Sequence, residues 1–182
     1  IYGMGAQRFS RATGVSQTQA KEFLEKYKNR YPKIFSFLEM QERHALSRGY
    51  VETIFGRRRI FNFNPNGLGR LRGIPPHEID LNIARRGGLE AQQLRAAANA
   101  PIQGSSADII KLAMINLNKQ IKEKGLRSRL LLQVHDELLL EAPHDEIHQT
   151  KQMVIKIMEN AVILKVPLIV DTGIGDNWME AK

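Results

Sequence analysis

The sequence contains no cysteine among its 182 residues. Without thiols the chain can form no disulfide bond, hold no zinc ion through sulfur and perform no thiol catalysis. It also lacks any apolar run near the roughly 20 residues that a membrane-spanning helix requires. Hydrophobic residues at 42% and charged residues at 25% are ordinary values, which exclude a disordered or fibrous protein. We therefore expect a globular chain that folds without a disulfide bond or a metal ion and that does not span a membrane.

The chain starts at Ile1 without an initiator methionine or a signal-peptide pattern, so we expect its natural start to lie upstream.

The chain is basic, and one long, strongly basic stretch of it contains arginine but no lysine. Lys and Arg number 27 against 19 Asp and Glu, which gives a formal net charge of +8. Residues 43–95 contain ten arginines, no lysine and four acidic residues, so most of the net charge lies there. The planar guanidinium pairs bidentately with phosphate and stacks on bases. This block predicts a nucleic-acid surface, with a solvated face and an anionic membrane as the alternatives.

The apolar spacing and the capping residues predict an α+β fold, with helices on one face of a small antiparallel sheet. Ser16 and Gln19 form a capping-box pattern at the start of the first helix. The expected order is helix 16–31, helix 33–48, strand 50–55, loops with at most one short helix over 62–88, a helix from Ser105 or Ser106 to about Lys122, a buried strand pair over 129–141, helix 145–164 and strand 167–171.

Two adjacent carboxylates, Asp136 and Glu137, lie between the apolar runs 130–134 and 138–140. A carboxylate pair on a rigid strand tip suits Mg²⁺, which favours one or two carboxylates together with substrate phosphates. A charged hairpin tip that only keeps the chain soluble is an equally good interpretation. His135 beside them fits a general base, a phosphate donor or a turn residue.

Arg95, Asn99 and Gln103 are spaced four residues apart. On one helix they would present a guanidinium and two amides on the same face, able to donate to the acceptors of a DNA minor groove. Pro101 argues that such a helix bends or ends there, and polar residues on a solvent face are the plainer interpretation. Tyr2 before Gly3 could stack on a base or fill a core.

Five strings in order make the chain resemble the C-terminal part of family A DNA polymerases of the DNA polymerase I type. They are residues 1–4 (IYGM), 49–59 (GYVETIFGRRR), 99–111 (NAPIQGSSADIIK), 133–137 (QVHDE) and 173–178 (GIGDNW). The resemblance implies that residues 1–60 are part of the fingers subdomain, that 61–94 are an Arg/Pro/Gly-rich connection with an insertion, and that 95–182 are the palm.

The resemblance also implies roles for individual residues. Asp136 matches a catalytic aspartate that binds metal, Glu137 a supporting carboxylate, and His135 a histidine at the primer end. The implied DNA contacts are Arg95, Asn99 and Gln103 in the minor groove, together with Arg57 and Arg58. Tyr2 and Gly3 match the site beside the incoming nucleotide and the template base.

The implied reaction is template-directed addition of deoxynucleotides to a primer 3′-OH by two-metal phosphoryl transfer, with two Mg²⁺ ions in the complete site. The implied partners are primer-template DNA and deoxynucleoside triphosphates, for a monomer in the bacterial cytoplasm or in an organelle. The second catalytic aspartate and the triphosphate-binding Arg and Lys of this family are absent from the chain. We therefore expect the isolated chain to be inactive.

Two other functions fit parts of the sequence. A nucleic-acid-binding module would use Asp136 and Glu137 only as a turn and would need no divalent ion. A metal-dependent nuclease or phosphatase would need more clustered ligands, for which His144, Asp145 and His148 are the nearest candidates. Those three fall at an expected helix start, where Asp is a common cap.

Overall fold

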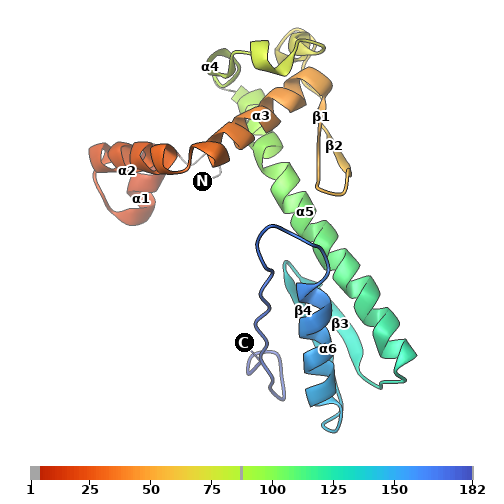
Figure 1. Ribbon diagram of the computed structural model, residues 1–182. Coiled ribbons are helices and arrows are strands. Elements are labelled where there is room, and N and C mark those ends of the chain that lie inside the picture. The colour runs from red at the N-terminus through yellow and green to blue at the C-terminus, as the bar shows by residue number, and fades with distance from the viewer. Residues whose placement is uncertain (1–4, 87, 182) are drawn as a thin grey trace. The chain divides into compact units, whose positions relative to one another are not determined.

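The computed structural model describes residues 5–86 and 88–181 and combines helices with two antiparallel strand pairs (Figure 1). This confirms the expected α+β class. The chain divides into two compact units after Gly104, and each unit has its own hydrophobic cluster. Within the described residues, no helix has both the length and the hydropathy that crossing a membrane would take.

The first unit begins with three helices, α1 (Ala6–Thr13), α2 (Gln17–Arg30) and α3 (Pro32–Arg48). The expected capping box is present at the start of α2. The Ser16 hydroxyl accepts from the Gln19 backbone N–H at 3.2 Å, and the Gln19 side-chain oxygen accepts from the Ser16 N–H at 3.0 Å. Pro32 is the first residue of α3, where its missing N–H costs nothing.

A short hairpin follows α3. Strand β1 (Tyr50–Glu52) pairs antiparallel with β2 (Arg58–Ile60), and Gly56 adopts a positive φ of 78° in the connecting turn. The expected strand over 50–55 is therefore shorter than predicted. Val51 is buried and anchors the hairpin in the first hydrophobic cluster.

The prediction of loops with at most one short helix over residues 62–88 agrees with the single short α-helix found there, but the stretch also contains two 3₁₀ turns. The segment forms two 3₁₀ turns, η1 (Leu68–Leu71) and η2 (Pro76–Glu78), and a short helix, α4 (Leu81–Ala84). Its apolar side chains enter the first cluster, which also takes residues from α3, β1 and α5. The buried members are Ala45, Leu46, Val51, Phe61, Phe63, Ile79, Leu81, Ala84, Leu94, Ala97 and Ala100. Burial of these side chains orders a stretch whose Pro and Gly content predicts loops.

Polar contacts fasten the same segment. The Glu90 carboxylate accepts from the backbone N–H groups of Asn64 at 2.8 Å and Leu68 at 3.2 Å. Arg85 donates to the buried carboxylate of Glu42, with 2.7 Å between Nη2 and Oε2. Burial raises the pKa of Glu42 above its ordinary value, although the Arg85 charge opposes that shift. The connection is therefore held to both α3 and α5.

Helix α5 (Gly88–Glu123) begins well before the predicted start at Ser105 or Ser106 and continues through Pro101. Residues 91–100 contain five alanines, which are strong helix formers. Leu94 and Ala97 are completely buried on this part of the helix. An interior proline costs about 3 kcal/mol. Packing of the alanine-rich turns offsets this cost, a contribution that local sequence rules do not include.

The second unit contains the C-terminal part of α5, the hairpin of β3 (Arg129–Val134) with β4 (Glu137–Glu141), and α6 (Ile147–Glu159). One face of the hairpin packs on the helices. The buried residues of this cluster are Leu117, Ile121, Met153 and Val154, and Leu126, Leu130, Leu138, Leu140, Ile157 and Met158 pack against them.

Three details of the second unit differ from the predictions. The strand pair is not buried on both faces, because Leu131 and Leu132 are 49% and 51% exposed. Helix α6 ends at Glu159, before the predicted Leu164. Residues 167–171 form no strand, since no described strand pairs with them.

A buried carboxylate joins the start of β3 to the start of α6. Glu146 accepts from the backbone N–H groups of Arg127 at 3.0 Å and Ser128 at 2.9 Å, and from the Ser128 hydroxyl at 2.8 Å. These hydrogen bonds, the Arg127 backbone N–H foremost, lower the pKa of Glu146 to about 2. The folded state therefore favours the ionised form.

We predict that Glu146→Gln destabilises the chain at pH 7, and that the difference from the wild type shrinks under acidic conditions. The folded pKa of about 2 lies below the ordinary 4.5, so the stabilisation is complete above that ordinary value and declines toward the folded one. Urea unfolding followed by circular dichroism at several pH values measures this. Asp145→Asn, which removes an exposed partner of Arg127, is the control and should have little effect. A wild-type advantage that does not change with pH would contradict the assignment.

Candidate nucleic-acid interface and carboxylate turn

The second unit presents its carboxylates on a two-residue turn. Val134 pairs with Glu137 across the hairpin, which leaves His135 and Asp136 as the connection. All three polar residues, His135, Asp136 and Glu137, are exposed. The structure thus brings them together at the strand tip, as the sequence predicts.

His135 has a positive φ of 54°. A residue with a side chain pays about 1–2 kcal/mol for this left-handed conformation, and two-residue hairpin turns usually place glycine at such positions. The Gln133 side chain donates to the His135 carbonyl at 2.6 Å and helps to hold the turn. Strain of this kind is often retained at functional sites. The hairpin therefore carries a histidine where glycine would fold more easily.

The carboxylates at the turn fit an incomplete magnesium site. In residues 5–86 and 88–181, no group of three His, Asp or Glu lies close enough together to hold a metal ion. Mg²⁺ commonly takes one or two protein carboxylates and completes its shell with water and substrate phosphates. Asp136 has the chemistry and the exposure for such a role. Glu137 is the next residue along, at the start of β4.

The residues that would serve a nuclease have other partners. The Asp145 carboxylate pairs with the Arg127 guanidinium. The Nε2 atom of His148 lies 2.9 Å from the side-chain nitrogen of Gln152. The structure gives no support to a second metal-binding cluster at the start of α6.

The first unit presents the polar residues of α5. Arg95, Asn99 and Gln103 all lie on this one helix, and Arg95 and Gln103 are exposed. Asn99 is half-buried, and its amide oxygen is buried without a hydrogen-bond partner among the described residues. Such an atom is costly in a folded chain, and no contact within the described residues explains it.

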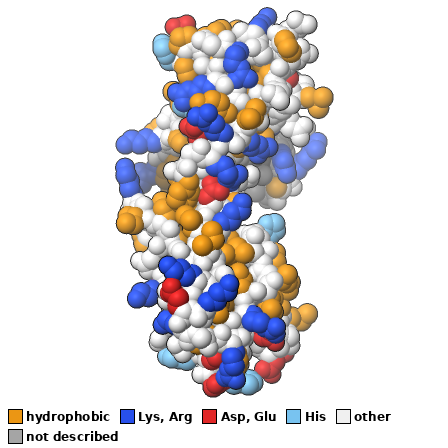
Figure 2. Space-filling model, turned by 90° about the vertical axis from the view of Figure 1, so that its right-hand side faces the viewer, with side chains coloured by type: hydrophobic (Ala, Val, Ile, Leu, Met, Phe, Trp, Pro, Cys, Tyr) orange, Lys and Arg blue, Asp and Glu red, His pale blue; other side chains and the backbone are white. Residues whose placement is uncertain are grey.

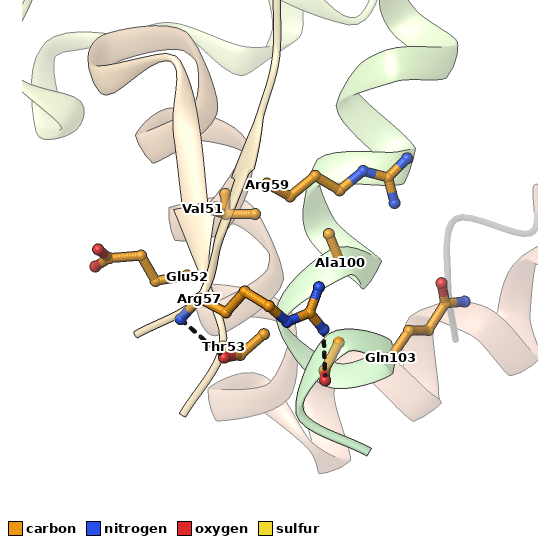
Figure 3. A pocket seen from close by; sticks show the side chains of 8 residues that line it. Val51, Glu52, Thr53, Arg57, Arg59, Ala100 and Gln103 are labelled. Atoms are coloured by element: carbon orange, nitrogen blue, oxygen red, sulfur yellow. Dashed lines mark hydrogen bonds between the residues drawn. The ribbon is translucent and has the colours of Figure 1, made fainter. Parts of the chain in front are cut away.

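A hollow of about 110 Å³ lies between the β1–β2 hairpin and α5 in the first unit (Figure 3). It is lined by Val51, Glu52, Thr53, Arg57, Arg59, Ala100, Gln103 and Gly104. The Arg57 guanidinium reaches α5 and donates to the Gly104 carbonyl at 3.1 Å. Glu52 points away from that guanidinium in Figure 3. The hollow combines two arginines, an amide and the Glu52 carboxylate, which is paired with Arg58. Its guanidinium and amide groups suit an anion or a polar groove edge.

Arg58 has a different environment from its neighbour. Its Nε atom donates to the Glu52 carboxylate at 2.9 Å, and its guanidinium lies 4.4 Å from the centre of the Tyr50 ring. The hydrogen bond to Glu52 raises the pKa of Arg58. Arg57 and Arg58 are adjacent in sequence, but only Arg57 lines the hollow.

Of the eight residues that line the hollow, the sequence predicted only Arg57 and Gln103 as site residues. Thr53 and Arg59 also line the hollow, and both lie in the string 49–59 without having been assigned a role from it. Gly104 carried a usable signal, since a glycine inside a helix often marks a close approach of another segment. Tyr2 and Gly3 lie outside the described residues.

Basic side chains are more frequent than acidic ones on the surface (Figure 2). Figure 2 shows Lys and Arg spread over much of one face, with fewer acidic side chains among them. This agrees with the net charge of +8. A surface of this kind attracts polyanions over a long range at low salt.

The chain matches known proteins along its full length. The model of DNA polymerase family A covers residues 1–180. DNA polymerase I from Synechocystis sp. is 50% identical over all 182 residues, and the thermostable DNA polymerase I from Thermus filiformis is 41% identical over the same length. The chain covers 18% and 19% of these two relatives, so it spans about a fifth of their length.

One solved structure with a similar fold is the POL domain of Pol1 from M. smegmatis, in complex with DNA primer-template and dNTP. The TM-score is 0.78 and the sequence identity 41%. The similarity covers 99% of this chain and 29% of that one.

We predict that His135→Gly is more stable than His135→Ala by about 1 kcal/mol, because glycine avoids the clash of a left-handed residue. Urea unfolding of both variants measures the difference. The same pair at Gln133, which has no positive φ, is the control and should show the reverse order, since glycine there only adds backbone entropy to the unfolded chain. An alanine variant as stable as the glycine variant at position 135 would show that the turn is not strained.

Proposed function

This chain belongs to DNA polymerase family A, and we propose that the protein containing it is a DNA-directed DNA polymerase. It would extend a primer 3′-OH with deoxynucleotides chosen by a template strand. The observation that carries this proposal is the placement of Asp136 at an exposed, strained hairpin tip in a chain of this family. The relative from M. smegmatis, solved with primer-template DNA and dNTP, supports the choice of partners.

The proposed subdomains follow the resemblance. Residues 1–60 form part of the fingers, 61–94 a connection with an insertion, and 95–182 the palm. The protein works as a monomer in this proposal.

The carboxylate turn would carry the chemistry. Asp136 binds Mg²⁺ and Glu137 supports it, while His135 meets the primer end. When bound, two such ions lower the pKa of the attacking hydroxyl and neutralise the triphosphate and its leaving group. A rigid strand tip suits this task because a metal ligand must be held closely in place.

The first unit would hold the DNA. Arg95, Asn99 and Gln103 donate to minor-groove acceptors, which occur at every correct base pair and so allow copying without sequence preference. Arg57 and Arg58 contact the strand backbone from the hairpin. Tyr2 and Gly3 lie beside the incoming nucleotide in this proposal.

We predict that Asp136→Asn in the full-length protein slows primer extension at least about 100-fold, since each 1.4 kcal/mol of lost transition-state stabilisation costs a factor of ten. Primer-template affinity should stay close to that of the wild type, because the removed charge binds metal and not DNA. Gel-based extension and fluorescence anisotropy measure the two quantities.

Asp145→Asn is the matched control for this experiment. Asp145 is an exposed carboxylate of the same unit and pairs with Arg127 instead of standing at the hairpin tip. It should leave both extension and DNA binding unchanged. Normal extension by the Asp136 variant would remove our assignment of the metal ligand.

We also predict that the purified 182-residue chain binds primer-template DNA weakly and does not extend it. The described residues supply the Asp136 turn but no cluster of three metal-binding side chains. Binding should weaken steeply with salt, as expected for contacts to phosphate. Efficient nucleotide incorporation by the isolated chain would refute this expectation.

A further inference from the structure

Helix α5 carries a glycine in its interior at a cost. Gly104 lies well inside the 36 residues of α5 and does not have a positive φ. Glycine in such a position is less favourable than alanine, because it loses more backbone freedom on folding. A helix that tolerates this loss usually gains something from the missing side chain.

The missing side chain makes room for the turn of the β1–β2 hairpin. A Cβ atom built on Gly104 would lie 2.7 Å from the Thr53 Cγ2 atom and 3.4 Å from the Arg57 Nη2 atom. The first distance is well inside ordinary carbon contact. An added methyl group would therefore push the turn and the helix apart.

Thr53 cannot readily move its methyl group aside. Its hydroxyl accepts from the backbone N–H groups of Phe55 at 3.3 Å and Arg57 at 3.2 Å. Its own N–H donates to the Arg57 carbonyl at 3.0 Å. Rotation of the Thr53 side chain would break these hydrogen bonds. A methyl group at position 104 would therefore force the hairpin turn away from α5.

The same contact sets the position of Arg57. Its guanidinium crosses from the hairpin to donate to the Gly104 carbonyl, one residue beyond Gln103 (Figure 3). Ala100 and Ala97 lie one and two turns earlier on α5 and are also small and buried. The helix thus presents a run of small residues to the first unit, and Gly104 is where the hairpin turn comes nearest.

We infer that Gly104 is a positioning residue: by lacking a side chain it seats the β1–β2 turn on α5 and so holds Arg57 and Gln103 at one hollow, where both contact DNA. This inference rests on the proposed function for its DNA contacts. The seating itself depends only on the first unit.

The test is a pair of substitutions in the full-length protein. Gly104→Ala should weaken primer-template binding about tenfold, the effect of losing one charge-assisted contact. The slope of log affinity against log salt concentration should become shallower by about one, which is the contribution of one phosphate contact. Thr53→Ser removes the methyl group but keeps the hydroxyl, so adding it to Gly104→Ala should restore both affinity and salt slope. Gly5→Ala, whose Cβ meets nothing within 4 Å, is the control and should behave as the wild type.

Restoration of DNA affinity and salt slope by Thr53→Ser supports the inference. If Gly104→Ala alone fails to fold, recovery of folding and DNA binding in the double variant supports it equally. Wild-type affinity in Gly104→Ala overturns it. A loss that Thr53→Ser does not repair overturns it as well.

Hydrogen exchange separates this inference from the proposed function. The amides of Phe55 and Arg57 should exchange faster in Gly104→Ala and return to wild-type rates in the double variant, without any DNA present. If the wild-type protein does not bind DNA, the proposed function fails, and with it the DNA role of Gly104. If exchange at Phe55 and Arg57 is unchanged in Gly104→Ala, Gly104 does not position the hairpin turn, even if DNA binding is intact.

Discussion

Close packing along the N-terminal half of α5 is the constraint on which the first unit depends. Its buried side chains are mostly alanine, so the backbone can come near to the segments that cover it. The apolar residues of segment 61–84 enter the same cluster and turn a Pro- and Gly-rich stretch into ordered structure. At Gly104 the approach leaves no space even for a methyl group. The arginines of the hairpin are therefore placed by hydrophobic packing and by one absent side chain.

The two units carry different chemistry, and each is supported by a hydrophobic cluster of its own. In the first, guanidinium and amide groups from a hairpin and a helix surround one hollow. In the second, a strand pair packed on two helices ends in a two-residue turn that exposes Asp136. Donors suit a polyanion and carboxylates suit a divalent cation. A polymerase needs both, because it must grip a negatively charged strand and stabilise charge at the reacting phosphate.

The sequence predicted best where structure depends on neighbouring residues. The capping box at Ser16 follows from local hydrogen bonding, and the polar tip at His135 and Asp136 follows from the two apolar runs that flank it. The early start of α5 and the helical turns within residues 62–86 depend on tertiary burial, which spacing does not reveal. The strand expected over 167–171 has the right composition but no described partner to accept its hydrogen bonds. The sequence did not predict that Arg59 and Thr53 line the hollow, because the fold of the hairpin against α5 brings them there.

Template-directed incorporation by the full-length protein tests the central claim most directly. Four primer-templates that differ only in the first unpaired template base would each be incubated with Mg²⁺ and one nucleotide at a time. The account predicts that each primer grows only with the complementary deoxynucleotide. Growth that ignores the template base, or no growth with any nucleotide, would contradict it.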